Sequence, residues 1–158
     1  MEFKEIIGHV EGFHIAFGIQ NNATTTLLDE DGATLRFSLM KEENEEYLEA
    51  AKNGDIVEIA DALGDQLYIL CGTLLRHGLQ HKIEEVFMEI QRSNMSKLDR
   101  NGKPIYREDG KVLKSELYFK LNIEKVLHWL SIVDIIGYDA SKSIYENKNC
   151  FAYANTWG

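Results

Sequence analysis

The chain has 158 residues, a formal net charge of −9 and a hydrophobic fraction of 44%, which is typical of one soluble globular domain of ordinary size. The N-terminus has no cationic start before an apolar run, and no stretch reaches the roughly 18 apolar residues of a membrane span, so we expect neither a signal peptide nor a membrane protein. Only two cysteines are present, Cys71 and Cys150, which favours a reduced, cytoplasmic protein. The acidity argues against nucleic-acid binding.

The predicted elements of the first third of the chain are helical. A short helix is predicted over 10–19, where apolar residues are frequent, and a loop follows over 20–26. The sequence Asp-Glu-Asp-Gly at 29–32 is typical of a turn or a helix start. A helix is predicted over 33–52, and the Asn-Gly-Asp sequence at 53–55 breaks it.

The second long helix has a recognisable start and end. Asp55 is a good N-cap, and the helix is predicted to run to about His77, where Gly78 ends it. A third helix is predicted over 82–94. The segment 98–114 contains the only proline and two Asn-Gly or Asp-Gly steps, so it is predicted to be a loop that includes a hairpin as one possibility. A last helix is predicted over 123–136.

Carboxylates interrupt the apolar face of the first long helix. Leu35, Leu39 and Ala50 share one stripe at helical spacing. The same stripe passes through acidic positions, namely Glu42, Glu43 and Glu46. Charged residues where an amphipathic helix would place core residues violate a local rule, and such violations often mark functional sites.

The second long helix separates a core face from an acidic face. Its predicted core stripe consists of Ile56, Ala60, Leu63, Leu67, Cys71 and Leu74. Glu58, Asp61 and Asp65 share a different face, and no lysine or arginine lies between Lys52 and Arg76. These acids therefore have no helical partner of opposite charge. A multivalent cation would relieve their mutual repulsion.

Two such helices packed antiparallel would direct four or more carboxylates at one space. Ligand sets made only of oxygen select hard cations, so Mg²⁺, or alternatively Mn²⁺, is expected over Zn²⁺. The alternative interpretation of each acidic cluster is a solvated helix face.

A basic segment follows at 92–120. Asn94 and Lys97 close the third helix, where they would contact substrate or form an ordinary C-cap. Arg107, Lys111 and Lys114 would grip phosphates or belong to a solvated basic loop.

Two sequence blocks resemble a known superfamily. The run EENEE at 42–46, followed by EIADALGD at 58–65, is similar to the Glu-x-x-Glu and Glu-x-x-Asp signature of all-α nucleoside triphosphate pyrophosphatases. That superfamily includes MazG-type enzymes, phosphoribosyl-ATP pyrophosphohydrolases and dimeric dUTPases. The block SNMSKLDRNGKPIYREDGKVLK at 93–114 resembles the downstream segment of the MazG-like branch. The similarity covers about 10–123.

The resemblance implies a fold, a reaction and a site. The fold is an all-α helical bundle completed by dimerisation, with a tetramer as the alternative, in a single domain over 1–158 whose tail at 124–158 has no assigned role. The reaction is attack of water between the α- and β-phosphates of a nucleoside triphosphate, releasing a nucleoside monophosphate and pyrophosphate. The implied metal ligands are Glu42, Glu43, Glu46, Glu58, Asp61 and Asp65. Glu43 or Glu46 would accept the proton of water.

Two other functions stay open. Phosphoribosyl-ATP would need the same metal site as an ordinary nucleoside triphosphate, so the motif does not separate these two substrates. A non-catalytic helical module that binds metal or nucleotide is the alternative from another class, although the acids of both pairs are present.

Overall fold

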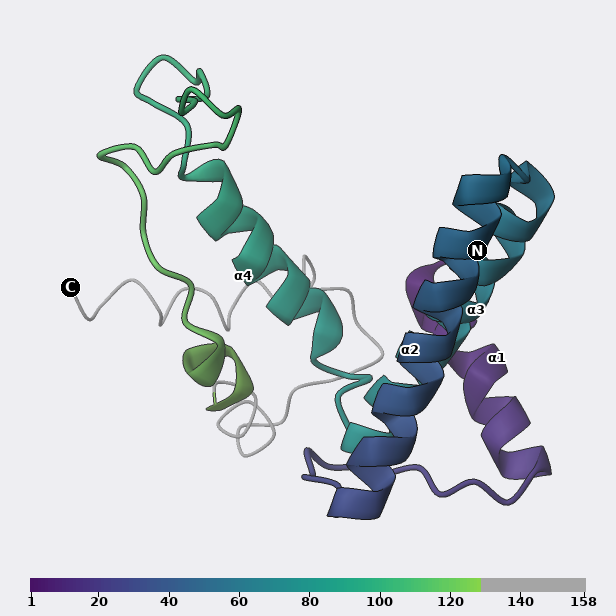
Figure 1. The fold of residues 1–158 in the computed structure, drawn as a ribbon. Helices are drawn as coiled ribbons and strands as arrows, with labels where there is room; N and C mark the ends of the chain where they lie inside the picture. Colours follow the sequence, from purple (N-terminus) through teal and green to yellow (C-terminus); the bar gives the residue numbers. More distant parts are fainter. Residues whose placement is uncertain (129–158) are drawn as a thin grey trace. The chain divides into compact units, whose positions relative to one another are not determined.

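The computed structural model describes residues 1–128, and its regular elements are helices (Figure 1). The all-α fold class predicted from the sequence is therefore confirmed. The chain divides into two compact units, with the boundary in the sequence between Ile83 and Glu84. A single domain over the whole chain stays a prediction. The last predicted helix is helical at 123–128, and its remainder lies outside the described residues. No helix among the described residues is long and apolar enough to cross a membrane.

The first unit consists of α1 (Phe3–Ala16), α2 (Glu30–Asn53) and α3 (Ile56–His77). Helix α1 begins earlier than predicted because Glu5 caps its start: Glu5 Oε2 accepts a hydrogen bond from the Glu2 backbone N–H at 2.8 Å. A side-chain acceptor at this position satisfies a backbone donor that the helix leaves open.

Caps define the hairpin of α2 and α3. Asp29 begins α2 by accepting the Gly32 N–H at 2.9 Å, and Gly54 ends it in the left-handed conformation with φ 68°. Asp55 then accepts the N–H groups of the first turn of α3 at 3.0 and 3.2 Å, as predicted for an N-cap. The two helices pack along each other as an antiparallel pair (Figure 1).

The loop between α1 and α2 covers the C-terminal end of α3. The Asn22 N–H donates to the Leu75 carbonyl, and the Thr26 N–H donates to the His77 carbonyl, both at 2.9 Å. Gly78 ends α3 with φ 66°, and the Thr24 carbonyl oxygen lies 2.0 Å from where a Cβ would stand. Only glycine fits there, so the predicted helix stop is also the point where the loop approaches α3.

The core is small and lies between α1 and the second half of α3. It consists of Ile7, Val10, Cys71, Leu74 and Leu75.

The predicted core stripe of α3 is wrong in its first half. Ile56, Leu63 and Leu67 are 72%, 48% and 37% exposed, whereas Ala62 on another face is buried. Leu35 of the α2 stripe is also exposed. Periodicity identifies an apolar face but not what covers it, and within the described chain α1 covers only the second half of α3.

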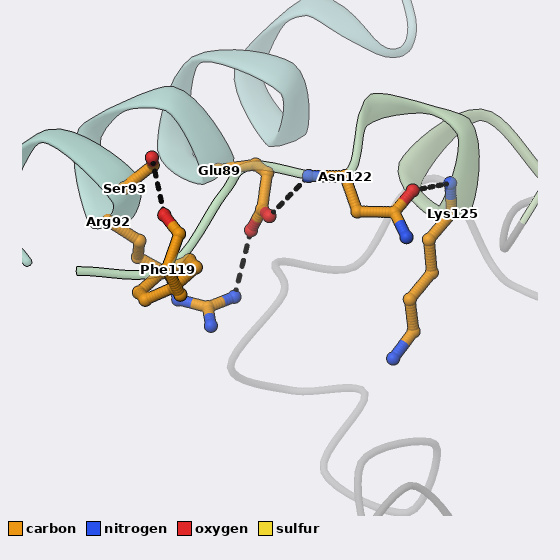
Figure 2. Close-up of polar contacts among 6 residues, drawn as sticks. All are labelled: Glu89, Arg92, Ser93, Phe119, Asn122 and Lys125. Atoms are coloured by element: carbon orange, nitrogen blue, oxygen red, sulfur yellow. Dashed lines mark hydrogen bonds and ion pairs between the residues drawn. The ribbon is translucent and has the colours of Figure 1, made fainter. Parts of the chain in front are cut away.

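The second unit contains α4 (Ile83–Met95) and a returning segment that packs on it. Ser93 Oγ donates to the Phe119 carbonyl at 3.0 Å, and Glu89 accepts both the Asn122 N–H and the Arg92 guanidinium at 3.0 Å (Figure 2). Between these anchors the predicted hairpin is present in minimal form, as one antiparallel bridge from Tyr106 to Val112.

Candidate functional site

Four carboxylates of the α2–α3 hairpin act electrostatically on a fifth, Glu43. Burial, followed by the negative charges of Glu46, Asp65, Glu42 and Asp61, raises the pKa of Glu43 above its ordinary value. The hairpin therefore brings together acids of both predicted pairs. We call these five residues the acidic cluster.

Helix pairing explains why Glu43 is the least exposed member. Gln66 on α3 donates through Nε2 to the backbone carbonyl of Glu43 at 3.2 Å and to Asn44 Oδ1 at 3.4 Å. This contact places Glu43 at the level of Gln66, adjacent to Asp65. The Glu43 side chain is half-buried, and its Oε2 is buried without a hydrogen-bond partner. A buried polar atom in that condition is costly unless a ligand satisfies it.

Glu58 is placed differently from the other predicted ligands. It lies in the first turn of α3, beside the N-cap Asp55, and it is not among the charges that act on Glu43. In an antiparallel hairpin this turn pairs with the end of α2, beyond Glu46. The sequence grouped Glu58 with Asp61 by helical spacing and by the Glu-x-x-Asp signature.

The donor set suits a hard divalent cation, although no three acidic, histidine or cysteine side chains in the described residues converge as a ready-made metal site. The cluster offers only carboxylate oxygens, the donors that Mg²⁺ prefers. The unsatisfied Oε2 of Glu43 adds a buried acceptor to that set. The residues therefore fit such a cation in chemistry and in excess negative charge.

The predicted substrate-binding residues of the second unit have partners of their own. Lys97 Nζ donates to Asn94 Oδ1 at 2.7 Å. Arg107 forms an ion pair with Asp109, and this hydrogen bond raises the pKa of Arg107. Lys114 Nζ lies 4.2 Å from the centre of the Tyr118 ring.

The neighbouring serines serve the fold. Ser93 is 2% exposed and binds the Phe119 carbonyl, while Ser96 donates to the Ser93 carbonyl and accepts the Phe119 N–H. The polar end of α4 thus anchors the returning segment.

Two arginines that the sequence did not single out lie in the first unit. Arg36 on α2 and Arg76 on α3 are half-buried and act on each other electrostatically. They are forty positions apart, so no local motif joins them. The available signal was that α2 and α3 form a hairpin, which pairs the start of one helix with the end of the other.

The family model described as phosphoribosyl-ATP pyrophosphohydrolase matches residues 10–94, more than half of the chain. The chain belongs to this family. Phosphoribosyl-ATP pyrophosphohydrolases are part of the MazG-like all-α nucleoside triphosphate pyrophosphatase superfamily and generally use a divalent metal. No curated protein matched the chain. The match contains the whole acidic cluster and Glu58, and it ends before Lys97, Arg107, Lys111 and Lys114.

Proposed function

We propose that this pyrophosphohydrolase cleaves the α–β phosphate bond of a nucleoside or deoxynucleoside triphosphate in a Mg²⁺-dependent reaction. The observation that carries the proposal is the half-buried Glu43, with an unsatisfied carboxylate oxygen, among four further carboxylates. A structural ion-pair network would place cations among these acids. Within the described residues the nearest ion pair on α2, Lys41 to Glu45 at 3.0 Å, leaves the cluster out.

The acidic cluster has two roles in this reaction. Glu42, Glu43, Glu46, Asp61 and Asp65 would hold the metal, with Glu58 as a further candidate ligand. A bound divalent ion would supply charge neutralisation of the phosphates and a lower pKa of water. Glu43 or Glu46 would accept the proton of the attacking water. The water oxygen bonds to the α phosphorus, the bond from that phosphorus to the bridging oxygen breaks, and pyrophosphate leaves with the bond electrons.

The second unit carries the other residues that the sequence suggests for substrate binding. Asn94, Lys97, Arg107, Lys111 and Lys114 remain candidates for the sugar or the phosphates. Arg107 would have to exchange Asp109 for a phosphate, so we expect a smaller contribution from it than from an unpaired arginine.

Phosphoribosyl-ATP is the second candidate substrate, and the family match favours it. It carries the same triphosphate, so the acidic cluster would act on it in the same way. A non-catalytic role as a binding module is the weaker alternative, because the acids that the reaction needs are present.

We further propose that the cytoplasmic enzyme is a dimer, with a tetramer as the alternative. The exposed apolar residues at the start of α3 supply a surface for a second copy. Light scattering at micromolar concentration should give a multiple of the chain mass of 18.1 kDa, and a monomer would contradict this.

One experiment tests both the reaction and the substrate. Purified protein with Mg²⁺ is incubated with phosphoribosyl-ATP and with a panel of standard and modified nucleoside triphosphates in ¹⁸O-labelled water. Attack at the α phosphorus puts the label in the monophosphate and releases pyrophosphate without orthophosphate. Label in pyrophosphate, or release of a nucleoside diphosphate, would contradict the proposed bond choice.

A further inference from the structure

Arg36 is a half-buried cation held in place by neutral groups. Its Nε donates to Thr73 Oγ1 at 3.1 Å, and its Nη2 donates to the Ile69 carbonyl at 3.2 Å. These two bonds fix the guanidinium between the levels of Ile69 and Thr73 on α3. A guanidinium has five N–H groups, so the remaining donors need other acceptors.

Arg76 is a second cation beside the first. Its Nη1 donates to the Gln20 carbonyl at 2.7 Å. Burial, followed by the charge of Arg76, lowers the pKa of Arg36, so the two guanidinium groups repel each other. No carboxylate of the described residues lies within ion-pair distance of either arginine. An anion between them would relieve that repulsion.

Gly72 of α3 has no side chain, and this allows the side chains of Arg36 and His14 to approach the helix closely. A Cβ there would stand 3.2 Å from Arg36 Nη2 and 3.0 Å from Nε2 of His14. The buried imidazole of His14 is held by a 2.6 Å hydrogen bond to Asn21 Oδ1. The guanidinium of Arg36 is thus bordered by a ring and a bare backbone, with no acidic side chain among these neighbours.

Arg36 lies on the face of α2 that carries Glu43 of the acidic cluster. Arg36 precedes Glu43 by two helical turns, which places both on one face of α2 about 10 Å apart along its axis. On α3 the guanidinium of Arg36 lies one to two turns beyond Asp65, or about 6–12 Å. A triphosphate extended along the hairpin would span the lower part of that range.

We propose that Arg36 and Arg76 form a subsite for the distal phosphates of the substrate, the pair that leaves as pyrophosphate. The ligand class is a di- or triphosphate, and the assignment of its α-phosphate to the acidic cluster rests on the proposed function. Guanidinium groups suit phosphate because they donate in a planar fork. The subsite lies in the first unit and is independent of Arg107, Lys111 and Lys114.

The test measures binding without catalysis. Isothermal titration of the full chain in EDTA uses inorganic tripolyphosphate and pyrophosphate as probes. The parent protein should bind both, and Arg36→Gln or Arg76→Gln should weaken binding by roughly tenfold or more. The matched control is Arg100→Gln, an exposed arginine paired with Glu116, which should bind like the parent. Absent binding to the parent, or unchanged binding to both glutamine variants, would overturn the subsite.

Three further measurements complete the test. With Mg²⁺ in place of EDTA, a nucleoside monophosphate should bind without dependence on the two arginines, and equal dependence would overturn the distal assignment. If Arg36→Gln does not fold, Arg36→Lys and Arg76→Gln decide, the lysine retaining charge and intermediate affinity. Hydrolysis is scored separately: arginine-dependent binding without any turnover refutes the proposed function and leaves the anion subsite, whereas turnover with an unchanged KM in both variants refutes the subsite alone.

Discussion

The acidic α2–α3 hairpin and the basic loop at 97–114 differ in how their charges are satisfied. In the hairpin, Glu43 is surrounded by carboxylates and keeps a buried oxygen without a partner. In the loop, Arg107 is paired with Asp109, Arg100 with Glu116, and Lys97 with Asn94. Both regions are strongly charged in sequence, but the acidic cluster of the hairpin gathers charge of one sign, whereas these three cations of the loop have partners in or next to it.

This difference changes which cations matter for a phosphate. A paired arginine must give up its carboxylate before it can bind a substrate, so its net contribution is small. Arg36 and Arg76 have no such partner within the described residues. A bound anion would therefore stabilise these two guanidinium groups more than it would stabilise a paired arginine. The surplus of unsatisfied charge, rather than the density of charged residues, indicates the ligand-binding region.

The largest expected effect is on turnover. Glu43→Gln should lower kcat by roughly 100-fold or more, because a general base typically contributes that much. Glutamine has similar helix propensity, so α2 should be retained. Glu45→Gln is the control, because Glu45 is a neighbouring acid paired with Lys41. Equal kcat values in the Glu43→Gln and Glu45→Gln variants would contradict the special role of Glu43 in the hairpin.

Metal binding should depend unequally on the acids of the hairpin. Mg²⁺ at about 100 times its Kd should stabilise the folded state by about 2.7 kcal/mol, which is a shift of several degrees in Tm. Asp61→Asn should remove most of this shift. Glu58→Gln should remove less, because Glu58 is not among the charges that act on Glu43. Melting scans with and without Mg²⁺ measure both, and parent-like shifts in Asp61→Asn would mean that the site is misplaced.

A smaller effect on stability follows from the pKa of Glu43. This pKa is raised in the folded state above its ordinary value of 4.5. At pH values between the unfolded and folded pKa, the folded protein therefore holds more protons than the unfolded chain. Ionisation of Glu43 therefore lowers the free energy of unfolding at pH values above the folded pKa and leaves it unchanged at pH values below the unfolded pKa. In EDTA, Glu43→Gln should raise Tm at neutral pH, and the gain should disappear below pH 4.5. A gain that is independent of pH would point to packing instead.

The smallest effect is expected in the basic loop. Arg107→Ala should raise KM by less than about fivefold and leave kcat similar, because Arg107 is exposed and already paired. Asp109→Asn removes that partner and should lower KM if Arg107 contacts the phosphates. Steady-state kinetics of both variants decide this, and a KM effect of Arg107→Ala larger than that of Arg36→Gln would reverse the ranking of the two regions.

Local signals predicted the local structure well. Asp55 and Gly78 were identified from residue type, because a cap depends on its own side chain or φ angle and on the adjacent turn. The acids were identified because three lie on one helical face without a cation nearby. The start of α1 was missed, although Phe3, Ile6 and Val10 already have helical spacing and pack in or against the core.

Features that depend on distant partners were not predictable in the same way. The exposure of Leu63 and Leu67 depends on how far α1 extends over α3. The pairing of Arg107 by Asp109 required the geometry of a turn. Arg36 and Arg76 became a pair only through the hairpin, and the lack of a nearby carboxylate is a property of space rather than of sequence.

The loop that covers the end of α3 links several parts of the first unit into one cooperative opening event. Asn22 and Thr26 donate to the last carbonyls of α3, while Gln20 accepts from Arg76 and Asn21 holds His14. Fraying of the last turn of α3 would therefore release the loop, the imidazole and one guanidinium together. Local unfolding proceeds in such contiguous units, so the end of the hairpin is either fully assembled or lost as a whole.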